Sequence, residues 1–107
     1  MTAALPTPEI LALEGEIDLH RSQEIKDLIQ PLVQRKAPRI FLDLSAVTYI
    51  DSSGLAVFIV ALQRVLGYGG KFGIFGLQQS VWNIFEIARL DQVFEMFPDK
   101  AAALAAS

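Results

Sequence analysis

The chain has 107 residues, the size of one typical domain, and 52% of them are hydrophobic against 20% charged. This composition argues against disorder and predicts a buried core. The chain has no cysteine and one histidine, which disfavours disulfide frameworks and thiolate or imidazole metal sites. Twelve acidic and nine basic side chains give a net charge of −3, the wrong sign for a nucleic-acid partner.

The uncharged stretches are too short to insert into a membrane. They run over residues 52–63 and 72–85, whereas a span needs about 20 residues. Met1 to Pro8 has no basic residue ahead of its apolar ones, so it is not expected to be a secretory signal. We therefore expect a cytoplasmic protein.

The first half of the chain has the pattern strand, helix, strand. Residues 9–15 form a short, largely apolar run, which predicts a strand. Residues 22–36 carry apolar side chains at helical spacing and predict an amphipathic helix, bent at Pro31. Residues 40–44 are almost all apolar, which is typical of a strand buried on both faces of a sheet. The apolar face of the helix consists of Ile25, Leu28, Ile29, Leu32 and Val33.

The second half continues the alternation. A helix is predicted over 53–68, ended by glycines, and a strand over 71–75. A further helix over 80–89 precedes a strand over 93–97. The core-facing side of the first of these helices comprises Leu55, Phe58, Ile59, Leu62, Val65 and Leu66, and that of the second Val81, Ile84, Phe85 and Ala88.

Such alternation predicts an α/β fold with a parallel or mixed sheet. Of the two we expect a mixed four- to five-stranded β-sheet packed by α-helices. We expect a single domain over 1–107, with its core at about 9–98 and an alanine-rich tail at 99–107 that includes a short helix.

One segment suggests a functional site. Asp51, Ser52 and Ser53 are all favourable N-cap residues at the start of the predicted helix over 53–68, although capping needs only one of them. A helix N-terminus also favours a phosphate, because its free amides and dipole are positive. Gly54 has no Cβ, so we expect it to leave room beside the hydroxyl. The segment is therefore either a plain capping turn or a phosphorylation site.

The motif Asp51-Ser52-Ser53-Gly54-Leu55, placed between a strand and a helix, resembles that of the STAS domain family and, within it, the bacterial anti-sigma factor antagonists. The resemblance also includes residues 15–18 and the Gly-Gly-Lys-Phe strand start, and it covers about residues 10–98. Two departures are Pro31 and Arg89, the latter standing where relatives commonly carry glycine.

The resemblance implies that a partner anti-sigma factor, an ATP-dependent serine kinase, phosphorylates Ser52, with Ser53 as second choice. The unmodified protein would bind this kinase and free a sigma factor, and a phosphatase would reset the switch. A phosphate on Ser52 would stand beside Asp51 and near Asp18, where the negative charges repel one another. A partner would have to desolvate the phosphate at a high cost, which switches binding off. The expected partner surface comprises Asp18, Asp51, Ser52, Ser53, Gly54, Leu55, Ala56 and Val57.

The alternatives are catalysis, a metal site and an adaptor role. Catalysis would need Ser52 as nucleophile and His20 as base, but the chain has no Gly-x-Ser-x-Gly elbow, so we do not expect an enzyme. We also predict no cofactor. Asp18, Asp43 and Asp51 form too weak a set for Mg²⁺, so no metal is predicted. The alternative that stays open is a non-phosphorylated STAS adaptor, either a subunit of a lipid-transporting ABC system or part of a stressosome-like scaffold.

Overall fold

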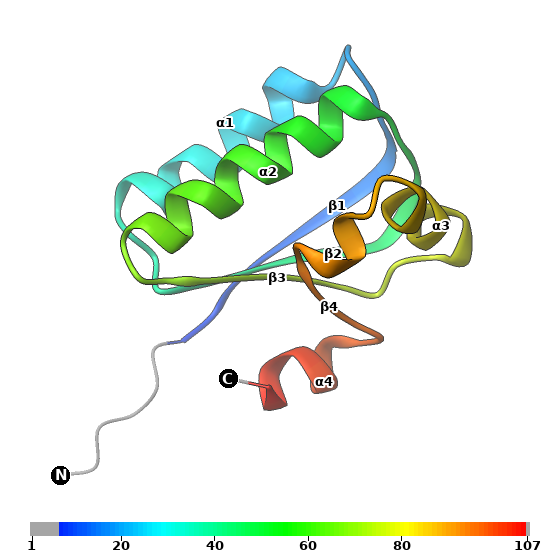
Figure 1. The fold of residues 1–107 in the computed structure, drawn as a ribbon. Helices are drawn as coiled ribbons and strands as arrows, with labels where there is room; N and C mark the ends of the chain where they lie inside the picture. The colour runs from blue at the N-terminus through cyan, green and yellow to red at the C-terminus, as the bar shows by residue number, and fades with distance from the viewer. Residues whose placement is uncertain (1–6, 107) are drawn as a thin grey trace, which may run out of the picture.

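A computed structural model describes residues 7–106 of the chain, as a sheet with helices on both faces (Figure 1). Residues 1–6 of the N-terminal segment, where no secretory signal was expected, lie outside this range. The strands are β1 (Glu9–Ile17), β2 (Arg39–Ile50), β3 (Lys71–Phe75) and β4 (Glu95–Phe97). The helices are α1 (Ser22–Gln34), α2 (Ser52–Gly67), α3 (Gln79–Ile87), the 3₁₀ helix η1 (Leu90–Gln92) and α4 (Lys100–Ala105).

The α/β fold class is confirmed, and the sheet has the order β1-β2-β3-β4. All three strand pairings within residues 7–106 are parallel, so this part of the chain forms a parallel sheet and not the predicted mixed one. The helices between consecutive strands supply the long crossovers that parallel pairing needs. Consequently the carboxyl ends of β1 and β2 emerge at the same edge of the sheet.

The two faces of the sheet are buried by different helices. Helices α1, α2 and α3 contribute to the main hydrophobic cluster, which includes the fully buried Phe58 and Phe85. On the other face Phe41 and Phe75 pack with Ala103 of α4 (Figure 1). The alanine-rich end of the chain therefore covers apolar surface of the sheet.

β2 is much longer than the predicted strand over 40–44, because residues 45–50 continue it. Its pairing with β1 shifts register twice, between Ala12 and Glu14 and between Gly15 and Glu16. Each shift is a bulge with one extra residue on β2. Beyond Leu44 the buried residues of β2 are therefore three positions apart, Val47 and Ile50, and the two-residue alternation that identifies a strand is lost.

Three side chains predicted to face the core lie outside it. Leu28 of α1 is 44% exposed and Leu66 of α2 is 59% exposed, while Ala88 follows α3 and is exposed. No helix within residues 7–106 has the length and apolar character that a membrane span requires.

Candidate functional site

The candidate site forms where β1 and β2 end together. Ile17 and Ile50 are register partners in the parallel pair, so Asp18 and Asp51, the residues that follow them, leave the sheet side by side. The backbone amide of Asp51 donates to the Ile17 carbonyl at 3.0 Å. Parallel pairing thus brings together two segments separated by about thirty residues in the sequence (Figure 1).

Asp51 is the N-cap of α2. Its Oδ1 accepts hydrogen bonds from the amides of Ser53 at 2.9 Å and Gly54 at 3.2 Å. Its Oδ2 accepts from the amide of Leu19 at 3.2 Å. One carboxylate therefore caps the helix and also holds the loop that follows β1.

Ser52 is the first residue of α2, and its side chain is exposed. Because Asp51 already caps the helix, the Ser52 hydroxyl is not required for capping. Among residues 7–106 no hydrogen bond engages this hydroxyl. The site thus presents a hydroxyl next to the free amides of a helix N-terminus.

Gly54 has a packing role that differs from the predicted one. A Cβ at this position would lie 2.7 Å from Cγ2 of Ile17 and 2.8 Å from Cγ1 of Ile50. The missing Cβ therefore faces the core and not the Ser52 hydroxyl. It allows the first turn of α2 to press onto the ends of both strands, which sets the position of Ser52 relative to the loop after β1.

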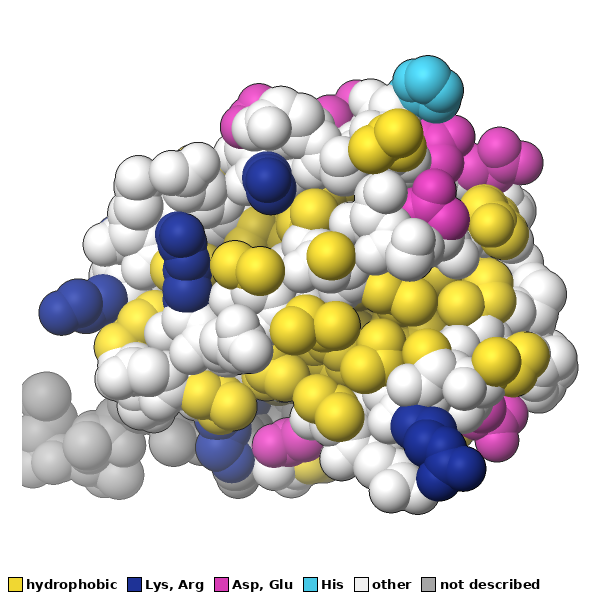
Figure 2. Space-filling view, turned by 45° about the horizontal axis from the view of Figure 1, so that its top comes forward, with side chains coloured by type: hydrophobic (Ala, Val, Ile, Leu, Met, Phe, Trp, Pro, Cys, Tyr) yellow, Lys and Arg dark blue, Asp and Glu magenta, His cyan; other side chains and the backbone are white. Residues whose placement is uncertain are grey.

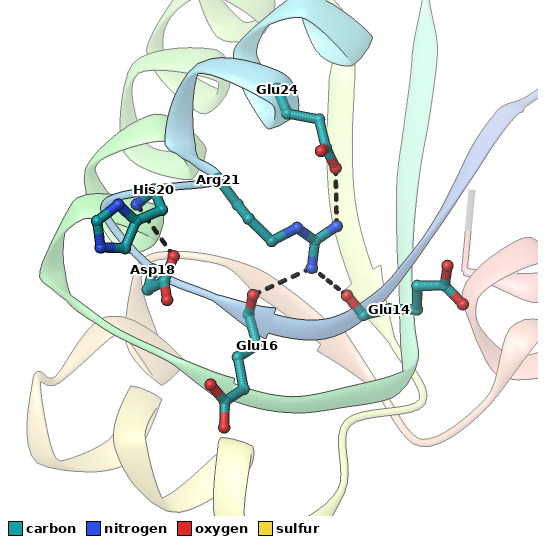
Figure 3. Close-up of polar contacts among 6 residues, drawn as sticks. All are labelled: Glu14, Glu16, Asp18, His20, Arg21 and Glu24. Carbon is teal, nitrogen blue, oxygen red and sulfur yellow. Dashed lines mark hydrogen bonds and ion pairs between the residues drawn. The ribbon is translucent and has the colours of Figure 1, made fainter.

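Arg21, the residue before α1, binds the end of β1 (Figure 3). Its guanidinium donates to the Glu14 carbonyl and, at 3.0 Å, to the Glu16 carbonyl, and it pairs with Glu24 at 2.8 Å. Residues 15–17 are the bulged end of β1, which runs two residues beyond the predicted strand over 9–15. Sequence reasoning did not single out Arg21, because an arginine in a polar segment carries no signal of its backbone partners.

The loop between β1 and α1 adds an exposed apolar side chain to the site. Leu19 is 68% exposed, and the amide of His20 donates to Oδ1 of Asp18 at 3.0 Å (Figure 3). Leu19 was not predicted as a site residue, since a single leucine in a polar loop has no pattern. It lies next to Asp51 through their hydrogen bond and thus belongs to the surface around Ser52.

The predicted partner surface is only partly accessible. Ser52 and Ala56 are exposed, whereas Asp18, Asp51 and Ser53 are half-buried. The remaining three residues, Gly54, Leu55 and Val57, are buried. Leu55 and Val57 pack into the core beneath the first turns of α2, so a partner at this surface would contact mainly the exposed residues and the backbone.

Asp43, one of the three acidic residues considered for Mg²⁺, has a hydrogen-bond partner of its own. Asp43 lies within β2, where its Oδ1 accepts from the Ser45 amide at 2.9 Å. Within residues 7–106 no group of three or more His, Asp or Glu side chains converges as a metal site would require.

Comparison with known proteins decides the family. The sequence-family model of the STAS domain matches residues 3–103. The chain belongs to the STAS domain family. The anti-sigma-B factor antagonist of Listeria monocytogenes is 29% identical over 82 residues, which are 77% of this chain and 72% of the relative.

Two solved structures share the fold. An anti-sigma factor antagonist from Mycobacterium paratuberculosis superimposes with a TM-score of 0.83 at 26% identity and covers 91% of this chain and 82% of its own. The Bacillus cell fate determinant SpoIIAA in its phosphorylated form gives a TM-score of 0.71 at 19% identity, with 96% of this chain and 95% of the other covered.

Proposed function

We propose that this STAS domain is an anti-sigma factor antagonist controlled by phosphorylation at Ser52. In its unphosphorylated form it binds an anti-sigma factor serine kinase in the cytoplasm and frees a sigma factor. It catalyses no reaction itself, and a phosphatase restores the active form. The whole chain, 1–107, acts as one domain. Its function requires no nucleic acid, no membrane insertion and no cofactor.

The observation that carries the proposal is the exposed hydroxyl of Ser52 at the first position of α2. A kinase needs its target hydroxyl accessible, and Asp51 leaves this one free by capping the helix itself. The relationship to the anti-sigma-B factor antagonists and to SpoIIAA, for which a phosphorylated form is known, supports the same reading. Ser53 is the second choice, because it is half-buried.

Phosphorylation would change binding through charge. A phosphoserine carries about −1.5 to −2 charges at pH 7. Here it would stand next to the Asp51 carboxylate, with Asp18 on the adjacent strand end. A partner that buries a neutral hydroxyl would have to desolvate this added charge, at a cost of several kcal/mol or about 100-fold or more in affinity.

The fold would survive the modification. The amides at the N-terminus of α2 favour a negative group, and the exposed side chain leaves space for it. The off state would therefore be a folded protein with a changed surface. We expect circular dichroism spectra of the two forms to be the same.

The direct test incubates the protein with ATP and the candidate serine kinases of the same genome and measures the intact mass. We expect one added phosphoryl group, lost in Ser52→Ala and retained in the matched control Ser53→Ala. Addition that persists in Ser52→Ala would reject Ser52 as the target.

Binding to the kinase tests the second half of the proposal. We expect Ser52→Asp to weaken binding by about 100-fold and Ser52→Ala to bind close to wild type. A partner that binds the Asp variant as tightly as the wild type would contradict the switch and favour a STAS adaptor without one.

A further inference from the structure

The end of α2 far from Ser52 carries apolar surface that the fold leaves uncovered. Leu66 is 59% exposed, and Val93, just after η1, is 54% exposed. Both line a surface hollow of about 340 Å³ together with the buried Leu62 and Phe72. Figure 2 shows that hydrophobic side chains form a broad area over α2 and the neighbouring α3–η1 segment.

Two opposite charges border the same hollow. Lys71 begins β3 and Glu95 begins β4, and both side chains line the hollow and are exposed. Glu95 is the register partner of Gly73, so it lies one strand across from Lys71 and displaced by two residues along the strand. Within residues 7–106 neither Lys71 nor Glu95 takes part in an ion pair, so both charges are available to another molecule.

We propose that this surface binds a second copy of the chain about a two-fold axis through the hollow. A two-fold interface uses the same patch on both subunits, so the patch must complement itself. Here an apolar centre lies beside one cation and one anion. Rotation about the axis brings Lys71 of each copy to Glu95 of the other while the two Leu66–Val93 surfaces cover each other.

The proposed interface is separate from the Ser52 site. Ser52 and Leu66 are fourteen residues apart in α2, or about 21 Å at 1.5 Å per residue. A dimer formed at the far end therefore leaves both Ser52 hydroxyls accessible. Because few apolar side chains take part, we expect a weak dimer with a dissociation constant in the micromolar range or above.

Sedimentation equilibrium of the purified chain, from micromolar to millimolar concentration, tests the apolar contact. We expect concentration-dependent dimers in the wild type and at least a tenfold higher dissociation constant in Leu66→Asp. Leu28→Asp is the matched control, because Leu28 is an exposed leucine on α1, outside the hollow, and it should dimerise as the wild type does. Circular dichroism confirms that each variant is folded.

Charge reversal tests the orientation. Lys71→Glu and Glu95→Lys should each raise the dissociation constant by about tenfold, and the double variant Lys71→Glu/Glu95→Lys should restore it to near the wild-type value. A wild type that stays monomeric at millimolar concentration overturns the proposal. So does a dimer that Leu66→Asp leaves unchanged, or a double variant that fails to recover. A monomer whose Leu66→Asp variant loses affinity for the kinase would assign the surface to that partner instead. None of these outcomes bears on whether Ser52 is phosphorylated.

Discussion

Asp51 shows how one residue joins several parts of the site. Its two carboxylate oxygens accept three amide hydrogen bonds, two from the first turn of α2 and one from Leu19. Helix caps alone contribute about 1 kcal/mol, and buried amides that lose their acceptor add to this. Asp51 is therefore a structural residue as well as the neighbour of the proposed phosphate.

Replacing Asp51 separates these contributions. We expect Asp51→Ala to lower the free energy of unfolding by about 2 kcal/mol, and Asp51→Asn, which keeps an acceptor oxygen, to lower it by less. Denaturant titration measures both. Asp99→Ala is the comparison, because Asp99 caps only the six-residue α4 through one amide at 2.8 Å, and its loss should be smaller. Equal effects at the two positions would show that the second amide of α2 and the bond to Leu19 add nothing.

Gly54 is a second residue whose importance depends on its surroundings. Alanine is the better helix former, but its Cβ would press on Ile17 and Ile50 at 2.7 and 2.8 Å. Crowding of this kind costs about 1–3 kcal/mol. We therefore expect Gly54→Ala to destabilise the protein, as measured by thermal and chemical unfolding.

Gly67 provides the matched control in the same helix. A Cβ at Gly67 has nothing within 4 Å. Gly67→Ala should therefore be neutral or stabilise by up to about 1 kcal/mol. If both variants shift stability in the same direction, crowding against the strand ends is not the reason for Gly54.

At the scale of elements, three helices end in the same way. The residue after the C-cap has a positive φ in each, namely Lys36 after α1 (54°), Gly69 after α2 (82°) and Arg89 after α3 (60°). This left-handed position favours glycine, and α2 alone among these three has one. Arg89 therefore occupies a position where glycine would be free of strain.

Substitution to glycine tests this interpretation. Lys36→Gly and Arg89→Gly should each leave stability unchanged or raise it by about 0.5–1 kcal/mol, since the gain in φ freedom opposes the entropy of a more flexible unfolded chain. Gly69→Ala should lower it by about 1 kcal/mol. A Cβ at Gly69 has open space around it, so that change reports on the backbone alone. Unfolding midpoints of the three variants decide the point.

Tyr68 ties the end of α2 to the connection between α1 and β2. Its hydroxyl donates to the Ala37 carbonyl at 2.6 Å, and burial raises the pKa of the Tyr68 hydroxyl above 10.0. A raised pKa means that the folded state holds the proton more firmly than the unfolded state. This stabilisation is fully present below pH 10 and is lost as the pH rises through the raised pKa of Tyr68 in the folded state.

Tyr68→Phe removes both the hydrogen bond and its titration. We expect a loss of about 1 kcal/mol at neutral pH. The difference between the two proteins should shrink above pH 10, where the wild type loses its advantage. Denaturant titrations at neutral and alkaline pH measure it, and a difference that stays constant with pH would contradict the assignment.

At the scale of the whole molecule, helices cover the two faces of the sheet to different extents. α1, α2 and α3 bury one face, while on the other face α4 is the helix, among residues 7–106, that packs on Phe41 and Phe75. Ala103 is 1% exposed there. A helix of six residues has little stability of its own, so its position depends on this packing.

A charge at Ala103 should detach the helix. We expect Ala103→Asp to lower the free energy of unfolding by about 2–4 kcal/mol, because a carboxylate would have to be buried against aromatic rings. Ala105→Asp is the control in the same helix, since Ala105 is exposed and should change stability by less than about 0.5 kcal/mol. If the two variants behave alike, α4 contributes nothing to the fold.

The sequence by itself determined the order and type of nearly all elements. The helical periodicity placed α1, α2 and α3 to within a few residues, and the apolar run over 71–75 placed β3. It also placed the start of α2 within Asp51, Ser52 and Ser53, because capping is a local interaction between a side chain and the next few amides. Local patterns were sufficient wherever local contacts decide the structure.

The tertiary structure decided everything that depends on distant partners. The two bulges extended β2 and hid its alternation, and parallel pairing set Asp18 beside Asp51. The close approach of Gly54 to two strands, the backbone contacts of Arg21 and the exposure of Leu66 likewise involve residues far apart in the chain. No local pattern encodes such contacts, because they arise only when separate elements meet in the folded molecule.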